Sequence, residues 1–120
     1  MKRPGVTSDP VRLRPHDVVI VPFPFADSST VKRRPALVLS SADFAAATGT
    51  VVLAMITTSA HDPWPHDVPL LDLDAAGLRV PCVVRWKLAS RDVRLVIGKV
   101  GALASRDRTA IRTALRAALG

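Results

Sequence analysis

The sequence predicts a mostly β domain of the α+β class: a small, strongly curved antiparallel barrel or sandwich that ends in one amphipathic helix. Three observations predict this fold. Short apolar segments rich in Val, Ile and Leu recur between Pro, Gly and Asp turn signals. The hydrophobic period changes from about 2 to about 3.6 near the C-terminus. The length of 120 residues favours a single domain.

The first expected strand, residues 17–25, is almost wholly apolar, as is typical of a strand buried on both faces. Pro22 and Pro24 cannot donate a hydrogen bond to a neighbouring strand, so they should shift the end of this strand to a sheet edge or a bulge. Further strands are expected at 35–40, 51–58, 68–73, 81–89 and 93–101.

The segments between the strands carry helix and turn signals. The Ala-rich residues 41–49 close on Gly49 and predict a short helix or a turn. Residues 59–67 contain two prolines and predict a loop, and residues 74–81 predict a turn or linker. Gly98 is expected to mark a bulge in the last strand.

Residues 81–89 show the clearest alternation in the chain. The face expected to join the core carries Cys82, Val84, Trp86 and Leu88. The opposite face carries Val83, Arg85, Lys87 and Ala89. This pattern sets Arg85 beside Lys87, either as a phosphate-binding pair or as an ordinary solvated face.

Residues 105–119 predict an amphipathic helix. Ser105 is the expected N-cap, and Asp107 lies in the first turn, where the helix dipole favours an anion. The apolar face is formed by Ile111, Ala114, Leu115, Ala118 and Leu119. Its flank carries a cation at every fourth position, namely Arg108, Arg112 and Arg116. This stripe could line an RNA groove or be a solvated helix flank.

The charge balance is strongly basic. Seventeen Lys and Arg face ten acids, all of them Asp, which leaves a net charge of +7 and a pI near 11.1. This balance favours a nucleic-acid partner, and a basic protein without such a partner is the alternative. The single cysteine, Cys82, excludes an intramolecular disulfide and favours a reducing, cytoplasmic compartment. We expect it to be a small buried hydrophobe.

Neither a membrane span nor a secretory signal is expected. No apolar run approaches the roughly eighteen residues that a spanning helix needs. The basic, proline-rich residues 1–14 lack the apolar region of a secretory signal. We expect them to form a flexible arm ahead of a domain at 15–120.

A basic cluster, Lys32-Arg33-Arg34, ends the predicted loop between the first two strands and is followed by Pro35. Cations held on a rigid scaffold are a common way to bind phosphate. The alternative is a solvated hairpin tip.

The predicted loop at 59–67 contains a symmetric run, HDPWPHD. Its His and Asp residues match no standard metal-ligand spacing, so a stiff surface loop is expected rather than a metal site. Trp64 in this run should anchor the loop in the core, although stacking on a base is an alternative. Trp86 alternates with core positions and is expected in the core.

Several segments share their order and spacing with a known family. They are DVVIVPFPF (17–25), KRRPALVLS (32–40), VLAMITTS (52–59), AGLRVPCVVRWKLAS (76–90) and IGKVGALAS (97–105). Over roughly residues 16–119 their pattern resembles the MazF/PemK family of toxin endoribonucleases from type II toxin–antitoxin systems. His16 stands where that family usually has Gly.

The resemblance implies an SH3-like barrel, usually a homodimer, that cuts single-stranded RNA at short sequences without a metal or other cofactor and leaves 5′-OH ends. It also implies an antitoxin partner, which the basic charge predicts to be acidic. By the family pattern, Arg34 and Thr57 are the expected catalytic residues. The expected RNA-binding residues are Lys32, Arg33, Ser59, Arg85 and Lys87.

The residues suit part of this chemistry. The guanidinium of Arg34 can stabilise a pentavalent phosphorane, and Thr57 can orient the 2′-OH or donate to a phosphate oxygen. The family pattern assigns no general base here, because Lys87 replaces an Asp found in one branch of the family. Asp27 and His16 are further candidates for this role.

Two other functions stay open from the sequence. The first is a non-catalytic barrel protein that binds nucleic acid or acts on a protein such as gyrase. The second is a structural homodimer whose arginines bind an acidic partner chain.

Overall fold

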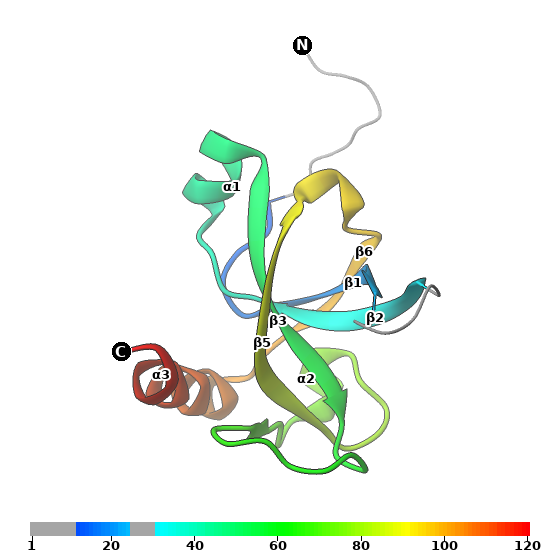
Figure 1. Ribbon diagram of the computed structural model, residues 1–120, viewed down its shortest axis with the longest axis vertical. Coiled ribbons are helices and arrows are strands. Elements are labelled where there is room, and N and C mark those ends of the chain that lie inside the picture. Colours follow the sequence, from blue (N-terminus) through cyan, green and yellow to red (C-terminus); the bar gives the residue numbers. More distant parts are fainter. Residues whose placement is uncertain (1–11, 25–30) are drawn as a thin grey trace.

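The computed structural model describes residues 12–24 and 31–120, which form one strongly bent antiparallel sheet with helices at its margins (Figure 1). The strands are β1 (Asp17–Pro24), β2 (Val31–Val38), β3 (Thr50–Thr58), β4 (Val68–Pro69), β5 (Cys82–Asp92) and β6 (Gly98–Ala102). The helices are α1 (Ala42–Thr48), α2 (Leu73–Ala76), the 3₁₀ turn η3 (Val93–Leu95) and α3 (Ser105–Leu119). The strand order is β4-β5-β3-β2-β1-β6, which confirms the predicted mostly β fold with a C-terminal helix.

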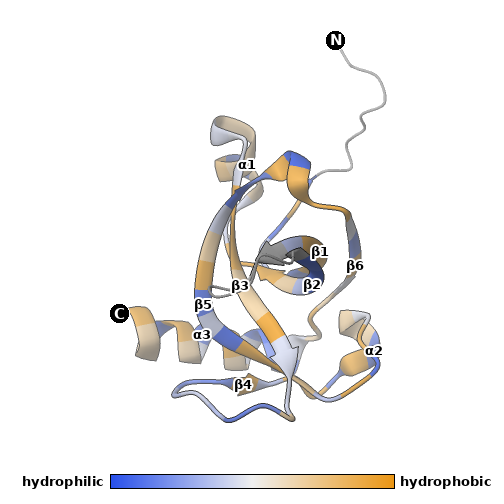
Figure 2. Cartoon of the chain, turned by 45° about the vertical axis from the view of Figure 1, so that its right-hand side comes forward, coloured by the Kyte–Doolittle hydropathy of each residue, from blue (hydrophilic) through white to orange (hydrophobic). Residues whose placement is uncertain are grey.

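Both faces of the sheet are buried, because each carries its own apolar cluster. On β3, Ala54 and Ile56 belong to the cluster that packs against Ile111 of α3. Met55, between them, belongs to the second cluster, with Val21 of β1 on the inside of the bend. Figure 2 shows the hydrophobic colouring of β3 and the hydrophilic loop beside β4.

The prolines of β1 act as predicted. β6 pairs with β1 only as far as Ile20, opposite Gly98, whereas β2 pairs with β1 out to Pro24. Pro22 and Pro24 therefore lie where β1 has one neighbour among the described strands. Because β6 does not extend to these two prolines, their lack of N–H groups removes no hydrogen bond from the β1–β6 ladder.

Two predicted boundaries were wrong near the basic cluster and at β4. Lys32, Arg33 and Arg34 lie within β2, not in a loop, because the hairpin ladder with β1 continues through them. The strand predicted at 68–73 stops at Pro69, because the backbone then turns into α2. The carboxylate of Asp107 on α3 accepts the N–H groups of Leu71 and Asp72 and so stabilises this turn.

The last part of the sheet also differs from the prediction. Residues 93–95 of the strand predicted at 93–101 form η3, and Asp92 caps this turn by accepting from the Arg94 N–H. The helix at 105–119 has the predicted bounds, but its N-cap is Ala104 rather than Ser105. The short helix predicted at 41–49 is present as α1 and ends at Gly49 in a left-handed conformation.

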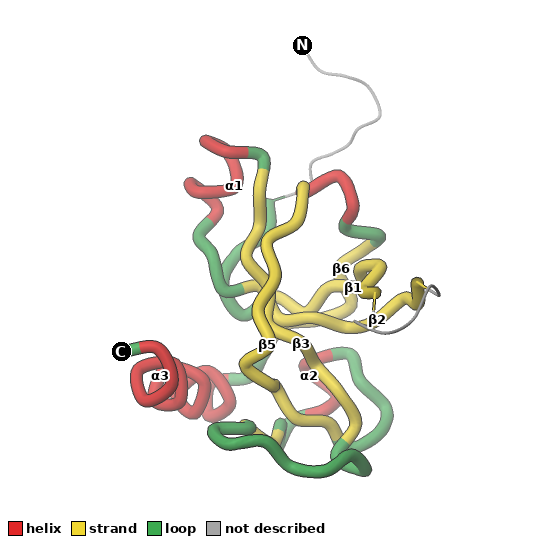
Figure 3. The backbone as a smooth tube through the Cα atoms, viewed as in Figure 1, coloured by secondary structure: helices red, strands yellow, loops and turns green. Residues whose placement is uncertain are grey.

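Close packing of α2 against β6 requires glycine. A Cβ on Gly101 would lie 2.4 Å from the carbonyl oxygen of Ala75, and neither backbone can yield easily. This contact positions the segment after β4 and so supports the end of the sheet that carries the loop 59–67 (Figures 1 and 3). Among the described residues, no helix has the length and apolar character needed to cross a membrane.

Candidate nucleic-acid interface

The two expected catalytic residues lie on neighbouring strands and on one face of the sheet. Arg34 pairs with Val21 of β1 and is half-buried. β2 pairs with β3 up to Ala36 opposite Met55. Arg34 precedes Ala36 by two residues and Thr57, also half-buried, follows Met55 by two, so both lie just beyond the last pair of this ladder. Because strand side chains alternate, both residues belong to the face that carries Met55.

The other predicted RNA-binding residues surround this pair. Lys32 and Arg33 are exposed on β2, next to Arg34. Ser59 is exposed just after β3, where its N–H donates to the Pro81 carbonyl at 3.0 Å. Lys87 is exposed on β5. Three exposed cations thus lie on the strands next to β3, and the exposed Ser59 follows the end of β3.

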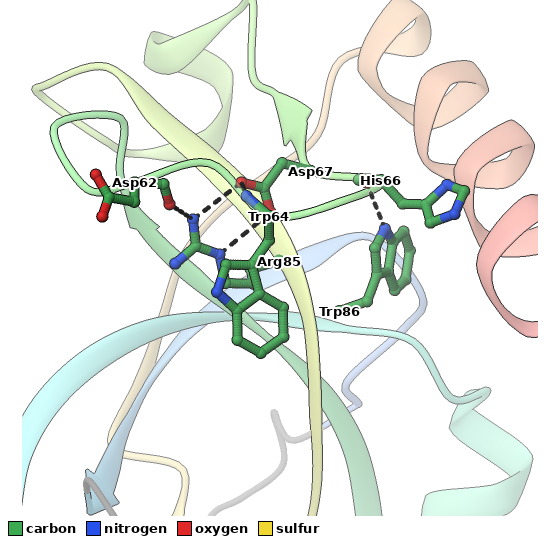
Figure 4. A network of polar contacts seen from close by, with 6 residues as sticks. All are labelled: Asp62, Trp64, His66, Asp67, Arg85 and Trp86. Atoms are coloured by element: carbon green, nitrogen blue, oxygen red, sulfur yellow. Dashed lines mark hydrogen bonds and ion pairs between the residues drawn. The ribbon is translucent and has the colours of Figure 1, made fainter.

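Arg85 differs, because it is buried within a polar network (Figure 4). Its Nε donates to Oδ1 of Asp67 at 3.2 Å and its Nη2 donates to Oδ2 at 2.9 Å. Nη2 also donates to the carbonyl of Asp62 at 2.8 Å. The Asp67 carboxylate therefore neutralises Arg85 inside the protein, and both side chains are about nine-tenths buried.

The same network shapes the loop 59–67. Asp67 Oδ2 accepts from the Trp64 N–H at 2.9 Å, and Trp86 Nε1 donates to the His66 carbonyl at 2.7 Å. Burial alone would raise the pKa of Asp67, but the hydrogen bonds from Arg85 and Trp64 and the charge of Arg85 lower it below its ordinary value. The hydrogen bond from Arg85 to Asp67 is also the main reason that the pKa of Arg85 is raised. Both groups are thus held in their charged forms.

The alternation at 81–89 predicted the wrong exposure for two residues. Ala54 pairs with Leu88 and Met55 pairs with Arg85, so Trp86 and Lys87 are two extra residues in a bulge of β5. An insertion of two residues keeps the alternation of faces, so Arg85 and Leu88 lie on the faces that the pattern predicts. Arg85 is nevertheless buried, because it binds Asp67 and the Asp62 carbonyl of the loop 59–67, and Leu88 is exposed. Trp86 packs partly against the core and Cys82 is buried, as predicted.

Trp64 does not anchor the loop in the core, because 42% of its surface is exposed. Its ring centroid lies 5.3 Å from Cζ of Arg85 and 4.9 Å from Nζ of Lys87. The ring borders an open pocket of about 390 Å³, which Ser59, Val83 and Arg85 also line. The prediction failed because the Arg85–Asp67 pair and the Trp86 hydrogen bond hold the loop, and the Trp64 ring lies over Arg85 rather than in the core.

The candidate bases are not equally well placed. The His16 N–H donates to the Val38 carbonyl, four residues beyond Arg34 on β2. Four strand residues span about 13 Å, so His16 is remote from Arg34. Burial and the nearby charges of Arg108 and Arg112 lower the pKa of His16. Asp27 lies outside the described residues.

The structure adds Asp67 to the residues that sequence reasoning identified around this site. The Asp precedes β4 by one residue and ends the HDPWPHD run, but nothing in the sequence paired it with Arg85. Within residues 12–24 and 31–120, no three His, Cys, Asp or Glu side chains are grouped so that they could hold a metal ion.

The comparisons with known proteins agree with the resemblance noted in the sequence. The model of the family described as "PemK-like, MazF-like toxin of type II toxin-antitoxin system" matches residues 14–119. A search of the curated proteins finds no match.

Solved structures match over almost the whole chain. MazF from Deinococcus radiodurans has 27% identity and a TM-score of 0.70, over 90% of this chain and 96% of that one. The Mycobacterium tuberculosis toxin MazF-mt6 has 25% identity and a TM-score of 0.68, over 88% and 95%. A mycobacterial endoribonuclease solved with its cognate antitoxin shares the fold at 19% identity, with a TM-score of 0.69 over 91% and 94%. The family model spans most of the chain, and the described strands and C-terminal helix agree with it, so the protein belongs to the PemK-like, MazF-like toxins of type II toxin–antitoxin systems.

Proposed function

We propose that this protein is a sequence-specific, metal-independent endoribonuclease that cleaves single-stranded RNA and thereby inhibits translation and growth. The observation that carries the proposal is the placement of Arg34 and Thr57 on adjacent strands and one face. The net charge of +7 and membership of a toxin family that includes proteins named as endoribonucleases support it.

In the proposed reaction the 2′-OH of the RNA attacks the adjacent phosphorus and the 5′-oxygen leaves. The products are a 2′,3′-cyclic phosphate and a 5′-OH end. Arg34 stabilises the negative charge of the phosphorane through a fork of N–H donors, so no metal is needed for that task. Thr57 orients the 2′-OH or donates to a phosphate oxygen. Both residues gain precision from their position on a packed sheet.

The surrounding cations have different proposed roles. Lys32, Arg33 and Lys87 are exposed and bind the RNA backbone, together with Ser59. Arg85 is neutralised by Asp67 and acts mainly by holding the loop 59–67 beside the RNA. Proton transfer from the 2′-OH has no assigned residue among those the structure describes.

The direct test is incubation of the purified protein with a long single-stranded RNA in EDTA. Discrete fragments whose 5′ ends accept phosphate from a polynucleotide kinase without prior dephosphorylation support the proposal. Arg34→Ala and Thr57→Val should each lower the rate by about 10²- to 10³-fold, the usual effect of removing one preorganised donor. An intact RNA, or Arg34→Ala cleaving like the wild type, contradicts it.

Two matched variants control for charge and for side-chain loss. Arg94→Ala removes one positive charge from the exposed η3 turn, at the opposite end of the sheet from the loop 59–67 (Figure 1). Thr58→Val changes the exposed neighbour of Thr57, on the other face of β3. Both variants should cleave at nearly the wild-type rate.

Lys87 replaces an Asp found in one branch of the family, which favours one alternative, a barrel protein that binds nucleic acid without cutting it. This alternative predicts RNA affinity that falls steeply with salt while the RNA stays intact.

The proposal includes a homodimer and an antitoxin partner. It also includes a cytoplasmic location, since cellular RNA is the proposed substrate. Charge complementarity favours an acidic antitoxin segment that competes with RNA for the basic surface. Antitoxin affinity should then fall as ionic strength rises. An affinity that does not depend on salt contradicts this part of the proposal.

A further inference from the structure

We infer that Trp64 and Lys87 form a subsite for one unpaired nucleobase of the substrate, next to the scissile phosphate. This inference deepens the proposed function and rests on it. In this subsite the indole ring stacks on the base, and Lys87 contacts an adjacent phosphate. Trp64 is thus a specificity-determining residue supplied by the loop between β3 and β4.

The subsite lies beside the proposed catalytic pair. Val83 lines the pocket that Trp64 borders, and Val83 is the direct strand partner of Thr57. Paired residues in a sheet lie about 5 Å apart, so the pocket begins one strand away from Thr57. Ser59, which follows Thr57 by two residues, lines the same pocket.

The ring of Trp64 is held in place although it is not buried. Pro63 and Pro65 restrict the backbone on both sides of it. The Trp64 N–H donates to the Asp67 carboxylate, and Arg85 donates to the carbonyl of Asp62, two residues before Trp64. A large aromatic side chain that is 42% exposed on a fixed loop can bind a ligand without a large loss of conformational entropy.

The charges around the ring favour a nucleotide over an apolar ligand. Arg85 is buried, so it supports the ring from the protein side, and Asp67 neutralises its charge. Lys87 is exposed, and its Nζ lies over the ring, 4.9 Å from the centroid. Because the lysine side chain is long and exposed, a base that stacks on the indole can displace it from the ring. The displaced ammonium then contacts the adjacent phosphate, so the pair matches the base and phosphate of one nucleotide.

The size and lining of the pocket agree with this assignment. Its volume of about 390 Å³ lies within the range of small-molecule sites. His61, His66 and Ser59 line it along with Trp64, and each can donate or accept a hydrogen bond at a base edge.

The test uses the full chain and a short RNA that spans a mapped cleavage site. An abasic ribose replaces each nucleotide around the scissile bond in turn. One abasic position should lower kcat/KM of the wild type by about 5- to 150-fold, the usual effect of losing one base–aromatic stack. Trp64→Ala should show the same loss on intact RNA and no further loss at that abasic position. Trp64→Phe, which keeps a stacking surface, should retain most of the activity.

A second measurement does not require cleavage. The chain has two tryptophans, so Trp64→Phe leaves Trp86 as the remaining fluorophore. Binding of a mixed-sequence single-stranded RNA with 2′-O-methyl groups, which prevent cleavage, should quench wild-type fluorescence strongly and Trp64→Phe fluorescence weakly. If the wild type does not cleave RNA at all, the proposed function fails, and this quenching still decides whether Trp64 contacts a base.

Two outcomes overturn the inference while leaving the endoribonuclease intact. In the first, Trp64→Ala cleaves the same sites at the wild-type rate, and RNA does not quench Trp64. In the second, Trp64→Ala cleaves RNA normally but no longer binds the antitoxin, which would assign the ring to a protein partner.

Discussion

The buried pair between Arg85 and Asp67 gives the most direct test of how the site is held together. Asp67→Asn keeps the size of the side chain but leaves the buried guanidinium without a counter-charge. The two side chains are 9% and 11% exposed and share two hydrogen bonds. Removing one partner of such a pair costs about 3–5 kcal/mol.

This cost converts to a measurable shift in the melting temperature, Tm. At about 2.1 cal/mol/K per residue, unfolding a 120-residue domain has an entropy of about 0.25 kcal/mol/K. Each kcal/mol therefore lowers Tm by about 4 °C, and Asp67→Asn should lower it by about 12–20 °C. Differential scanning calorimetry measures this shift, and amide hydrogen exchange of residues 59–67 reports whether the loop opens first.

Two comparisons make the test specific to the buried charge. Arg94 and Asp92 form an equally short contact, 2.8 Å, but Arg94 is 85% exposed, so Arg94→Ala should change Tm far less. The double variant Asp67→Leu/Arg85→Met removes both charges and should recover a large part of the loss. An unchanged Tm with unchanged loop exchange in Asp67→Asn would refute the reasoning, as would an equal effect of Arg94→Ala.

The pH dependence of the same pair has a defined sign. The pKa of Asp67 is lowered in the folded protein from an ordinary value of 3.8. Its contribution to stability is therefore fully present well above pH 3.8 and is lost as the pH falls through the lower, folded-state pKa. The stability difference between wild type and Asp67→Asn should be constant near neutral pH and shrink below about pH 4. A constant difference down to pH 2 in urea titrations contradicts this assignment.

Four further predictions follow from packing, backbone conformation and the titration of His16. Gly101→Ala should lower the free energy of unfolding in urea by about 1–3 kcal/mol or more, because the new Cβ would lie 2.4 Å from the Ala75 carbonyl oxygen. Gly98→Ala is the control, since a Cβ at Gly98 meets no atom within 4 Å. Asp107→Leu should lower the free energy of unfolding by about 2–5 kcal/mol in the same assay, since it leaves two backbone N–H groups before α2 without their acceptor. Near-wild-type stability would show that water replaces the carboxylate. His16 has a φ of 77°, so His16→Gly should be more stable than His16→Ala by about 1–2 kcal/mol, and equal stabilities would contradict the backbone argument. Because the pKa of His16 is lowered, the wild type should also lose stability as the pH falls below about 6.5, and His16→Gly should lose less.

Much of the fold could be read from local patterns. The apolar runs of β1 and β3 and the helical period of α3 depend on residues close in sequence, so their bounds were predicted to within one residue. The prediction of β4 failed, because the three leucines of residues 70–73 continue an apolar strand pattern. Their backbone is instead turned by Asp107, more than thirty residues away in the chain.

The candidate site was predicted in part for the same reason. Family spacing identified Arg34 and Thr57 as catalytic, and the sheet register brings them to one face. Their catalytic role stays a prediction. The burial of Arg85 could not be read from its strand, because its partner Asp67 lies in the loop 59–67 and not in the strand.

The sequence by itself determined β1, β3, the C-terminal helix, the basic charge and the family, since each rests on local periodicity, composition or motif order. Only the tertiary structure decided which cations face solvent. Asp67 lies eighteen residues before Arg85, and the two meet only when the loop folds back over β5. That contact converts one expected RNA-binding cation into an internal support and leaves Trp64 and Lys87 at the surface. The physical reason is that a cation can be buried only where an anion pairs with it, and the fold decides which distant anion comes within reach.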